Sequence, residues 1–376
     1  MREAGPLQPG REIELDFIRG LAILMVVDFH SPAPLLFYPF GLLGFKQHLG
    51  WMGVDVFFIL SGFLVGGLLV KEWQTRGAIN GKRFLIRRAL KIWPLYYIYL
   101  MIMLVTGHRT LHYLRGNLLN IQNYTGGVPH TWSLAVEEHA YLLLTLCLVI
   151  ASRRRVRMRT LFLVLAIISL GVVVLRIVIA TRGDDPDFYN KTHLRIEAIL
   201  YGVMLAILFR YAPSTFERLQ RLWWIWTGAL AAGLLYFRLD LQGAAFASLG
   251  LDVANFVGIA LLMLLYRRGR TRTRSMLYRC VAFIGMYSYG IYLWHVSVIV
   301  PVLAVGPFLP SWLVPVWTSF APPASAILAG ILLSRLIEFP ALRLRDRLFP
   351  GVMDSPVEPF ASTLAVAAGQ SYVCPP

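Results

Sequence analysis

Residues 15–30 read LDFIRGLAILMVVDFH, in which a largely apolar run, Leu21–Phe29, lies between Arg19 and His30. Eleven residues of α-helix turn through about 1100°, three turns plus roughly 20°, so Arg19 and His30 would share one helix face about 16 Å apart. An ionisable side chain at membrane depth is costly to retain, so His30 is a candidate functional residue. The alternative is a histidine that caps a short membrane span, and this stretch alone supports the two interpretations equally.

The composition of the chain indicates a membrane environment. Of the 376 residues, 57% are hydrophobic and 15% are charged, and the mean hydropathy is +0.62, whereas about a quarter of a soluble domain is charged. Apolar runs of about 20 residues, enough to cross a bilayer, recur along the chain. We therefore expect an all-α, polytopic membrane bundle. Its ten transmembrane helices are predicted at residues 17–37, 51–70, 92–107, 132–150, 160–180, 194–210, 222–238, 248–266, 281–303 and 314–337.

The charge pattern predicts the orientation of these helices. A net charge of +16 could suggest a nucleic-acid partner, but the basic residues lie in short clusters between the apolar runs, mostly in alternate loops. This pattern is typical of cytoplasmic loops facing anionic lipid, so we expect a lipid bilayer as partner, no nucleic acid, and both termini in the cytoplasm. Residues 1–345 are expected to form one membrane domain and 346–376 a flexible cytoplasmic tail. The three cysteines have no metal or redox spacing, and no metal site is expected.

A basic cluster, Arg87-Arg88-Ala-Leu-Lys91, precedes the third apolar segment. Arg88 and Lys91 are three residues apart, so their charged groups would converge on one helix face. Such a pair suits a phosphate-bearing ligand, with Arg offering two parallel donors and Lys a point charge. The alternative is a pair of anchors at the cytoplasmic end of a span, which explains most basic residues at such positions.

Two adjacent carboxylates open the fourth apolar segment, in the run Trp132-Ser133-Leu134-Ala135-Val136-Glu137-Glu138. Ser133 could cap this helix, and the helix dipole favours acidic side chains in the first turns. Glu137 is expected to face the bundle and pair with an Arg or His side chain, which favours a functional role. Glu138 points about 100° away, which favours a structural one.

Further polar side chains interrupt the other apolar segments. Asp55, Arg195 and Glu197 are expected to neutralise one another inside the bundle, and Asp16 precedes Arg19 by one helical turn. His295, which has aromatic neighbours, is more typical of the membrane interface than of a catalytic site. The sequence contains no Gly-x-Ser-x-Gly elbow, P-loop, dinucleotide fingerprint or zinc-protease motif, so a lone histidine base near a cationic phosphate site is the best chemical interpretation.

The order of these motifs resembles the integral-membrane acyltransferase 3 family, which includes O-acetyltransferases of bacterial polysaccharides and O-acyltransferases of macrolides. The resemblance covers about residues 12–345. Four matching segments carry it: Leu15-Asp16-x-x-Arg19-Gly20 leading to His30, Gly53–Phe63 (GVDVFFILSGF), Trp132-Ser133-Leu134-x-x-Glu137-Glu138, and Ser288-Tyr289-x-Ile291-Tyr292-Leu293-Trp294-His295.

The resemblance implies a multi-pass protein of the bacterial inner membrane in which Arg19 and His30 are essential for acyl transfer. It also implies that Arg88 and Lys91, with Arg87 beside them, hold acyl-coenzyme A from the cytoplasm. Lys91 stands where the family usually has a second Arg, so the bidentate fork is lost there. Family members often carry a further extracellular domain, and the length of this sequence favours a stand-alone enzyme.

These observations predict a membrane O-acyltransferase that moves a short acyl group from acyl-CoA to a hydroxyl of a carbohydrate or glycoside. We expect this acyl group to be acetyl. His30 would remove the hydroxyl proton, oriented by Glu137 or Asp55, while Arg19 stabilises developing negative charge. An acyl-histidine intermediate is equally compatible. The alternative function is proton-coupled transport of a sugar or lipid-linked glycan, which would need no covalent step. The paired repeats typical of transporters are not evident.

Overall fold

The computed structural model describes residues 12–31, 50–183, 189–238, 244–266 and 275–350, and within them every regular element is a helix. This confirms the all-α prediction. The helices of the first half are α1 (Ile13–Phe29), α3 (Met52–Arg76), α4 (Gly81–Val105), α5 (Leu111–Leu118), α6 (Gln122–Thr125), α7 (Trp132–Arg153) and α8 (Met158–Arg182). The second half contains α9 (Ile196–Tyr211), α10 (Pro213–Arg221), α11 (Trp223–Arg238), α12 (Ala244–Leu265), α13 (Met276–Met286), α14 (Ser288–Leu303), α15 (Val314–Leu333) and α16 (Phe339–Leu348).

Several of these helices are suited to cross a bilayer. Seven described segments are long and apolar enough, and the number rises to eight if α9 and α10, which meet at a bend of 113°, count as one broken span. The protein is therefore a polytopic membrane protein, although these criteria give fewer spans than the predicted ten. The predicted first span ran to residue 37, whereas α1 ends at Phe29. Residues 32–37, and the predicted positions of both chain termini, lie outside the described residues.

The predicted single helix at 281–303 is wrong, because two helices, α13 and α14, meet there at Tyr287. Each half packs on a different partner. Gly285 on α13 lies against the Asp16 carbonyl with no space for a Cβ, and Gly20 on α1 lies equally close to the Val281 carbonyl. α14 packs along α15 instead. One straight helix could not make both contacts, so the chain turns.

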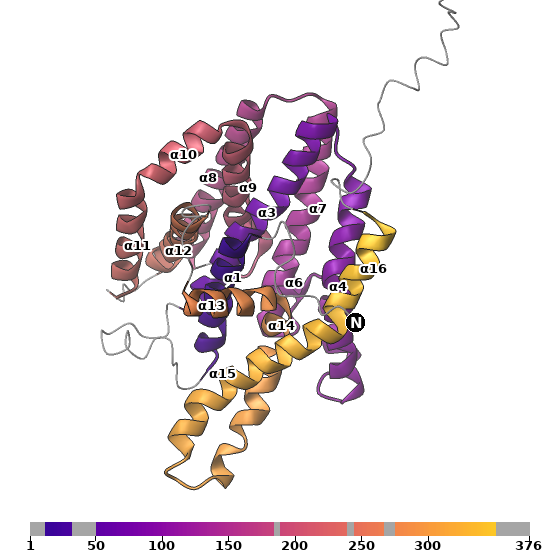
Figure 1. The fold of residues 1–376 in the computed structure, drawn as a ribbon, viewed down its shortest axis with the longest axis vertical. Coiled ribbons are helices and arrows are strands. Elements are labelled where there is room, and N and C mark those ends of the chain that lie inside the picture. The colour runs from indigo at the N-terminus through magenta and orange to yellow at the C-terminus, as the bar shows by residue number, and fades with distance from the viewer. Residues whose placement is uncertain (1–11, 32–49, 184–188, 239–243, 267–274, 351–376) are drawn as a thin grey trace, which may run out of the picture.

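The centre of the bundle is formed by α1, α3 and α9 (Figure 1). α3 and α9 approach closely because Gly62 lies against the Ile199 carbonyl and Gly202 against that of Ile59, leaving no room for a Cβ at either glycine. Small residues allow this backbone contact, which is the usual way that helices pack in membranes. α4, α7 and α16 lie on one side of this centre, and α8, α11 and α12 lie on the other.

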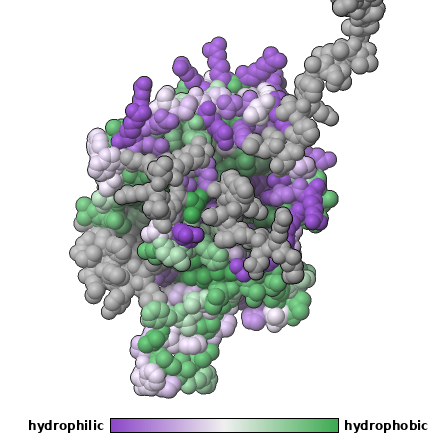
Figure 2. Space-filling model, viewed as in Figure 1, coloured by the Kyte–Doolittle hydropathy of each residue, from purple (hydrophilic) through white to green (hydrophobic). Residues whose placement is uncertain are grey.

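Hydrophilic side chains gather at one end of the molecule, where α3 and α7 end, as Figure 2 shows, whereas the projecting α14–α15 pair is largely apolar. The basic clusters around Arg76 and Arg153 lie at this end. α16 continues to Leu348, beyond the predicted domain boundary at residue 345, and the rest of the predicted tail, 351–376, lies outside the described residues.

Candidate active site

A cavity of about 1050 Å³ lies between α1, α3, α4, α7, α13, α14 and α16. Its charged lining is strongly basic, with six cationic side chains against three acidic ones: Arg19, Arg88, Lys91, Arg335, Arg343 and Arg345 against Glu137, Glu338 and Asp346. An excess of like charge around a largely apolar cavity is unfavourable unless an anion is bound. The cavity is therefore suited to an anionic ligand.

Arg88 and Lys91 reach this cavity from one face of α4. The Arg88 guanidinium lies 5.5 Å from the centre of the Phe84 ring and 5.3 Å from that of the Tyr141 ring. These rings hold its position through cation–π attraction and leave its N–H donors free. Among the described residues neither Arg88 nor Lys91 has a hydrogen-bond or ion-pair partner, so both are ready to bind a phosphate.

Glu137 lines the same cavity, at the end of a short chain of hydrogen bonds. Tyr141 donates its hydroxyl hydrogen to the Glu137 carboxylate at 2.7 Å, so the Ser61 hydroxyl, at 2.5 Å, donates to Tyr141. Glu138 is not part of the cavity lining and accepts a hydrogen bond from the Trp93 indole at 3.3 Å. The two adjacent carboxylates thus have different surroundings.

Arg19 and His30 do not share one site. Arg19 lines the cavity and lies 3.5 Å from the Asp16 carboxylate, whereas His30 is an exposed side chain at the opposite end of α1 and is not part of the cavity lining. The Nδ1 of His30 lies 2.9 Å from the Val26 carbonyl. Because a carbonyl can only accept, Nδ1 carries the hydrogen, and Nε2 keeps a free lone pair.

Buried aromatic side chains separate His30 from the cavity. His295, which is fully buried, lies with its Nε2 3.3 Å from Nδ1 of His30, and its own Nδ1 donates to the Tyr292 carbonyl at 2.6 Å. His130 packs on His295, with ring centres 5.2 Å apart. The Tyr292 ring lines the cavity, and its hydroxyl donates to the His130 carbonyl at 2.6 Å. Tyr292 and His295 thus lie between the cavity and His30.

Several predicted contacts of the site residues differ in the structure. Neither Glu137 nor Asp55 orients His30, because Val26 and His295 occupy its Nδ1–H. Ser133 does not cap α7, which begins one residue earlier, at Trp132. Its hydroxyl instead lies 2.6 Å from the Tyr292 hydroxyl. Since Tyr292 already donates its only hydrogen to a carbonyl, Ser133 is the donor in this pair.

Arg87 does not reach the cavity. Its guanidinium pairs with Asp346 of α16 at 3.0 Å and donates to the Phe349 carbonyl. Arg87 therefore fixes the position of α16 beside α4, and we do not assign it to ligand binding.

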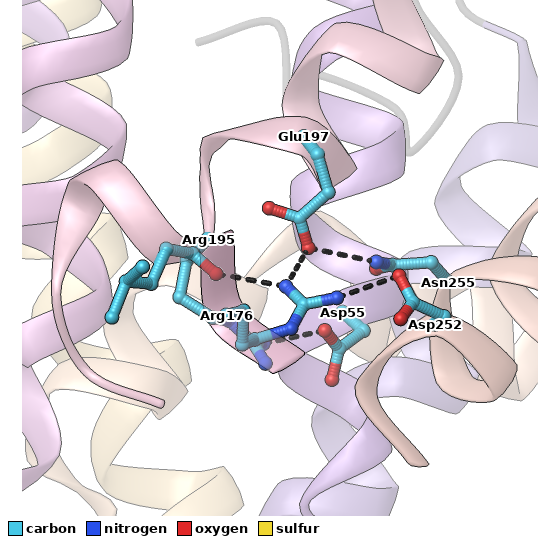
Figure 3. Close-up of polar contacts among 7 residues, drawn as sticks. Asp55, Arg176, Arg195, Glu197, Asp252 and Asn255 are labelled. Atoms are coloured by element: carbon cyan, nitrogen blue, oxygen red, sulfur yellow. Dashed lines mark hydrogen bonds and ion pairs between the residues drawn. The ribbon is translucent and has the colours of Figure 1, made fainter. Parts of the chain in front are cut away.

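Away from the cavity, a buried ion cluster joins α3, α8, α9 and α12 (Figure 3). Asp55 pairs with Arg195 at 2.5 Å, in partial agreement with the prediction. Glu197 pairs instead with Arg176, which also binds Asp252 at 2.6 Å. None of these side chains lines the cavity. Trp132 packs over the Arg195 guanidinium at 5.6 Å, so this group joins the helices rather than forming part of the candidate site.

His295, Tyr292, Tyr141 and the arginines of α16 were not predicted as site residues. His295 and Tyr292 belong to the polar motif at 288–295, which was the available signal. Within the described part of the chain, no group of three or more His, Cys, Asp or Glu side chains is arranged to hold a metal ion.

Comparison with known proteins agrees with the resemblance in the sequence. A family model described as an acyltransferase domain matches residues 12–338. A Staphylococcus aureus (strain COL) protein, provisionally named as an O-acetyltransferase, is 26% identical over 369 residues, which cover 87% of this chain and 56% of that protein. The peptidoglycan O-acetyltransferase OatA of Listeria monocytogenes is 24% identical over 365 residues, covering 87% of this chain and 55% of that protein.

A further relative, O-acetyltransferase OatA of Staphylococcus aureus (strain NCTC 8325), is 24% identical over 318 residues, covering 76% of this chain and 50% of that protein. The chain thus spans about half the length of the curated relatives that it matches. No solved structure matches it.

Proposed function

Because the chain belongs to the acyltransferase 3 family, we propose that it transfers an acetyl group from acetyl-CoA to a hydroxyl group of a carbohydrate or glycoside in a bacterial inner membrane. The observation that carries this proposal is the basic cavity, in which Arg88 and Lys91 have free donors and no partner among the residues that the structure describes. The peptidoglycan substrate in the name of the Listeria relative supports a glycan acceptor.

The donor's phosphates would bind Arg88 and Lys91, with Arg19 close to them. This placement changes the role expected for Arg19. Since Arg19 lines the cavity and His30 does not, we assign Arg19 to donor binding rather than to the reacting carbonyl. Glu137 offsets part of the positive charge beside Arg88 and leaves the cavity net cationic.

His30 is the proposed base, and its Nε2 lone pair is the reacting atom. In direct transfer, Nε2 takes the hydroxyl proton as the acceptor oxygen attacks the thioester carbonyl carbon. The C–S bond then breaks, and the departing thiolate receives that proton. In the relay route, through an acyl-histidine, Nε2 itself attacks the thioester carbonyl carbon, the C–S bond breaks and the thiolate leaves. The acceptor hydroxyl then attacks the acyl carbon, the C–N bond to Nε2 breaks, and the hydroxyl proton passes to the thiolate. Both routes fit the orientation of His30.

Tyr292 sets a condition on either route. Its ring lies at the cavity wall and packs on His295, with ring centres 5.7 Å apart. His295 in turn contacts His30, so the direct path of a thioester from the cavity to His30 leads past Tyr292. We infer that the reactive complex includes a displaced Tyr292 ring, which would break its hydrogen bonds with Ser133 and the His130 carbonyl.

The alternative of proton-coupled transport has weaker support. The buried charges Asp55, Arg195 and Glu197, which could have formed a proton path, are paired with other side chains and do not line the cavity.

Incubating the purified protein in lipid nanodiscs with acetyl-CoA labelled in the acetyl group and a pool of peptidoglycan fragments tests the proposal. We expect free CoA and labelled glycan in equal amounts. In proteoliposomes, movement of glycan without thioester consumption would instead support a carrier. Consumption of the thioester with labelled acetate as the sole product would contradict a hydroxyl acceptor in this pool.

A further inference from the structure

The C-terminal helix α16 forms part of the cavity wall, next to α4, the helix that carries Arg88 and Lys91. Phe339, Leu342, Arg343 and Asp346 all line the cavity, and their spacing of three and four residues places them on one helix face. Figure 1 shows α16 beside α4. The Arg87–Asp346 ion pair and the Arg87 hydrogen bond to the Phe349 carbonyl hold the two helices together. These two contacts fix the position of α16 relative to α4.

The cations of α16, and Arg335 in the π-helical turn Ser334–Glu338 that precedes it, differ in how free they are to bind a ligand. Arg345 is paired with Asp346 at 2.8 Å. Arg335 donates from Nε to the Tyr287 hydroxyl at 3.2 Å, and its guanidinium lies 5.7 Å from the centre of that ring, so its outer N–H groups remain available. Arg343 has no hydrogen-bond or ion-pair partner among the described residues. Its five donors are free, as are those of Arg88.

The basic groups of the two walls are electrostatically coupled. Arg345 repels both Arg88 and Lys91, and Arg19 also repels both. The three acidic groups of the lining cannot balance six cations, and two of them already have partners on their own helices: Asp346 with Arg345, and Glu338 with Ser334 at 2.7 Å. A ligand with one negative charge would leave most of this repulsion in place. A ligand with several phosphate charges would remove it.

On the basis of the proposed function, we propose that Arg343, supported by Arg335, binds a phosphate group of the acyl donor from the α16 side while Arg88 and Lys91 bind from the α4 side. The phosphate groups of the donor would thus be held between the two helices. Arg343 supplies the planar fork that Lys91 lacks, because guanidinium can bind a phosphate through two parallel hydrogen bonds and an ammonium cannot.

Binding of coenzyme A and of pantetheine, which lacks the phosphates, separates this role from a structural one. We would measure both by calorimetry on the nanodisc-embedded protein, comparing the wild type with Arg343→Ala, Arg343→Lys and Arg88→Ala. Arg347→Ala is the matched control, because Arg347 is an exposed arginine of the same helix outside the cavity lining. We expect Arg343→Ala to raise the Kd for coenzyme A roughly tenfold, the loss of one charge-assisted contact, and Arg343→Lys to raise it less. The Kd for pantetheine should not change, and Arg347→Ala should match the wild type.

Other outcomes would overturn the proposal. Equal weakening of coenzyme A and pantetheine by Arg343→Ala would show a structural effect, and no weakening of either would show that α16 does not contact the phosphates. Failure of the wild type to bind coenzyme A would overturn it as well. Because the readout is binding, the proposed function can fail separately. Phosphate-dependent binding with no acyl transfer would support the α16 contact and contradict the proposed acyltransferase function. Acyl transfer that needs Arg88 but not Arg343 would support that function and contradict the α16 contact.

Discussion

Removing the Asp55 carboxylate should destabilise the bundle far more than removing a surface charge, because Asp55 belongs to the buried ion cluster. Asp55 on α3 is 0% exposed, and Arg195, its partner at the start of α9, is 1% exposed. Asp55→Ala would leave the Arg195 guanidinium buried without its carboxylate. The two rings stacked on that guanidinium, Phe58 and Trp132, cannot accept a hydrogen bond in its place.

The expected loss follows from the geometry of this pair. Breaking a buried ion pair typically costs about 3–5 kcal/mol. A single hydrogen bond joins these two groups, at 2.5 Å. Within the described part of the chain, Oδ2 of Asp55 and Nε and Nη1 of Arg195 have no hydrogen-bond partner. We therefore expect the lower end, about 3 kcal/mol for Asp55→Ala. The double variant Asp55→Leu/Arg195→Leu removes both charges, so it should recover most of this loss.

Equilibrium unfolding in mixed micelles, followed by tryptophan fluorescence, provides the measurement, with both single variants and the double variant forming a mutant cycle. Glu217→Ala is the control, because Glu217 and Arg221 form an exposed pair at 4.0 Å, with side chains 64% and 78% exposed. It should change stability by less than about 0.5 kcal/mol. If Asp55→Ala behaved like this control, or if the double variant were as unstable as the two single losses combined, the buried pair would not join α3 to α9.

Two further predictions concern the candidate site. Lys91→Arg should keep or lower the KM for acetyl-CoA, whereas Lys91→Ala should raise it roughly tenfold with kcat little changed. The reason is that a cation at this position contacts the donor and not the reacting atoms. Steady-state kinetics test both variants, and an unchanged KM for Lys91→Ala would exclude the contact. His295→Leu should lower the single-turnover rate about threefold to tenfold, because His30 loses one of the two acceptors of its Nδ1–H. His295→Gln, which can place an acceptor close to the former Nε2, should restore part of that rate, and equal rates for both variants would show that His295 only fills space.

Much of the architecture was predictable because long apolar segments report helices directly. α8 illustrates this, since Met158–Arg182 covers the predicted span 160–180 with two residues added at each end, whereas α4 begins eleven residues before its predicted start. Arg88 and Lys91 could be placed on one face from spacing alone, and the structure shows both at the cavity. Local periodicity is sufficient for such predictions, because they concern residues within one or two turns of one helix.

Contacts between distant segments could not be predicted in the same way. Arg176 is visible in the sequence as a lone charge in an apolar helix, but its partners Glu197 and Asp252 lie 21 and 76 residues away. Tyr292 lies between the cavity and His30 because α14 contacts α1 through His295 and His30, and the start of α7 through Tyr292 and Ser133. The break between α13 and α14 likewise depends on glycine contacts with α1, which hydropathy does not report. The arginines of α16 resemble ordinary membrane anchors until their cavity is known.

The most direct test of the mechanism is acetyl transfer by His30→Ala, measured with labelled acetyl-CoA and glycan alongside His112→Ala, an exposed histidine of α5. We expect His30→Ala to bind coenzyme A normally but to lose transfer by at least about a hundredfold, the usual contribution of a positioned base. The His112→Ala variant should match the wild type. Transfer by His30→Ala at the wild-type rate would show that the acyl group never meets this imidazole.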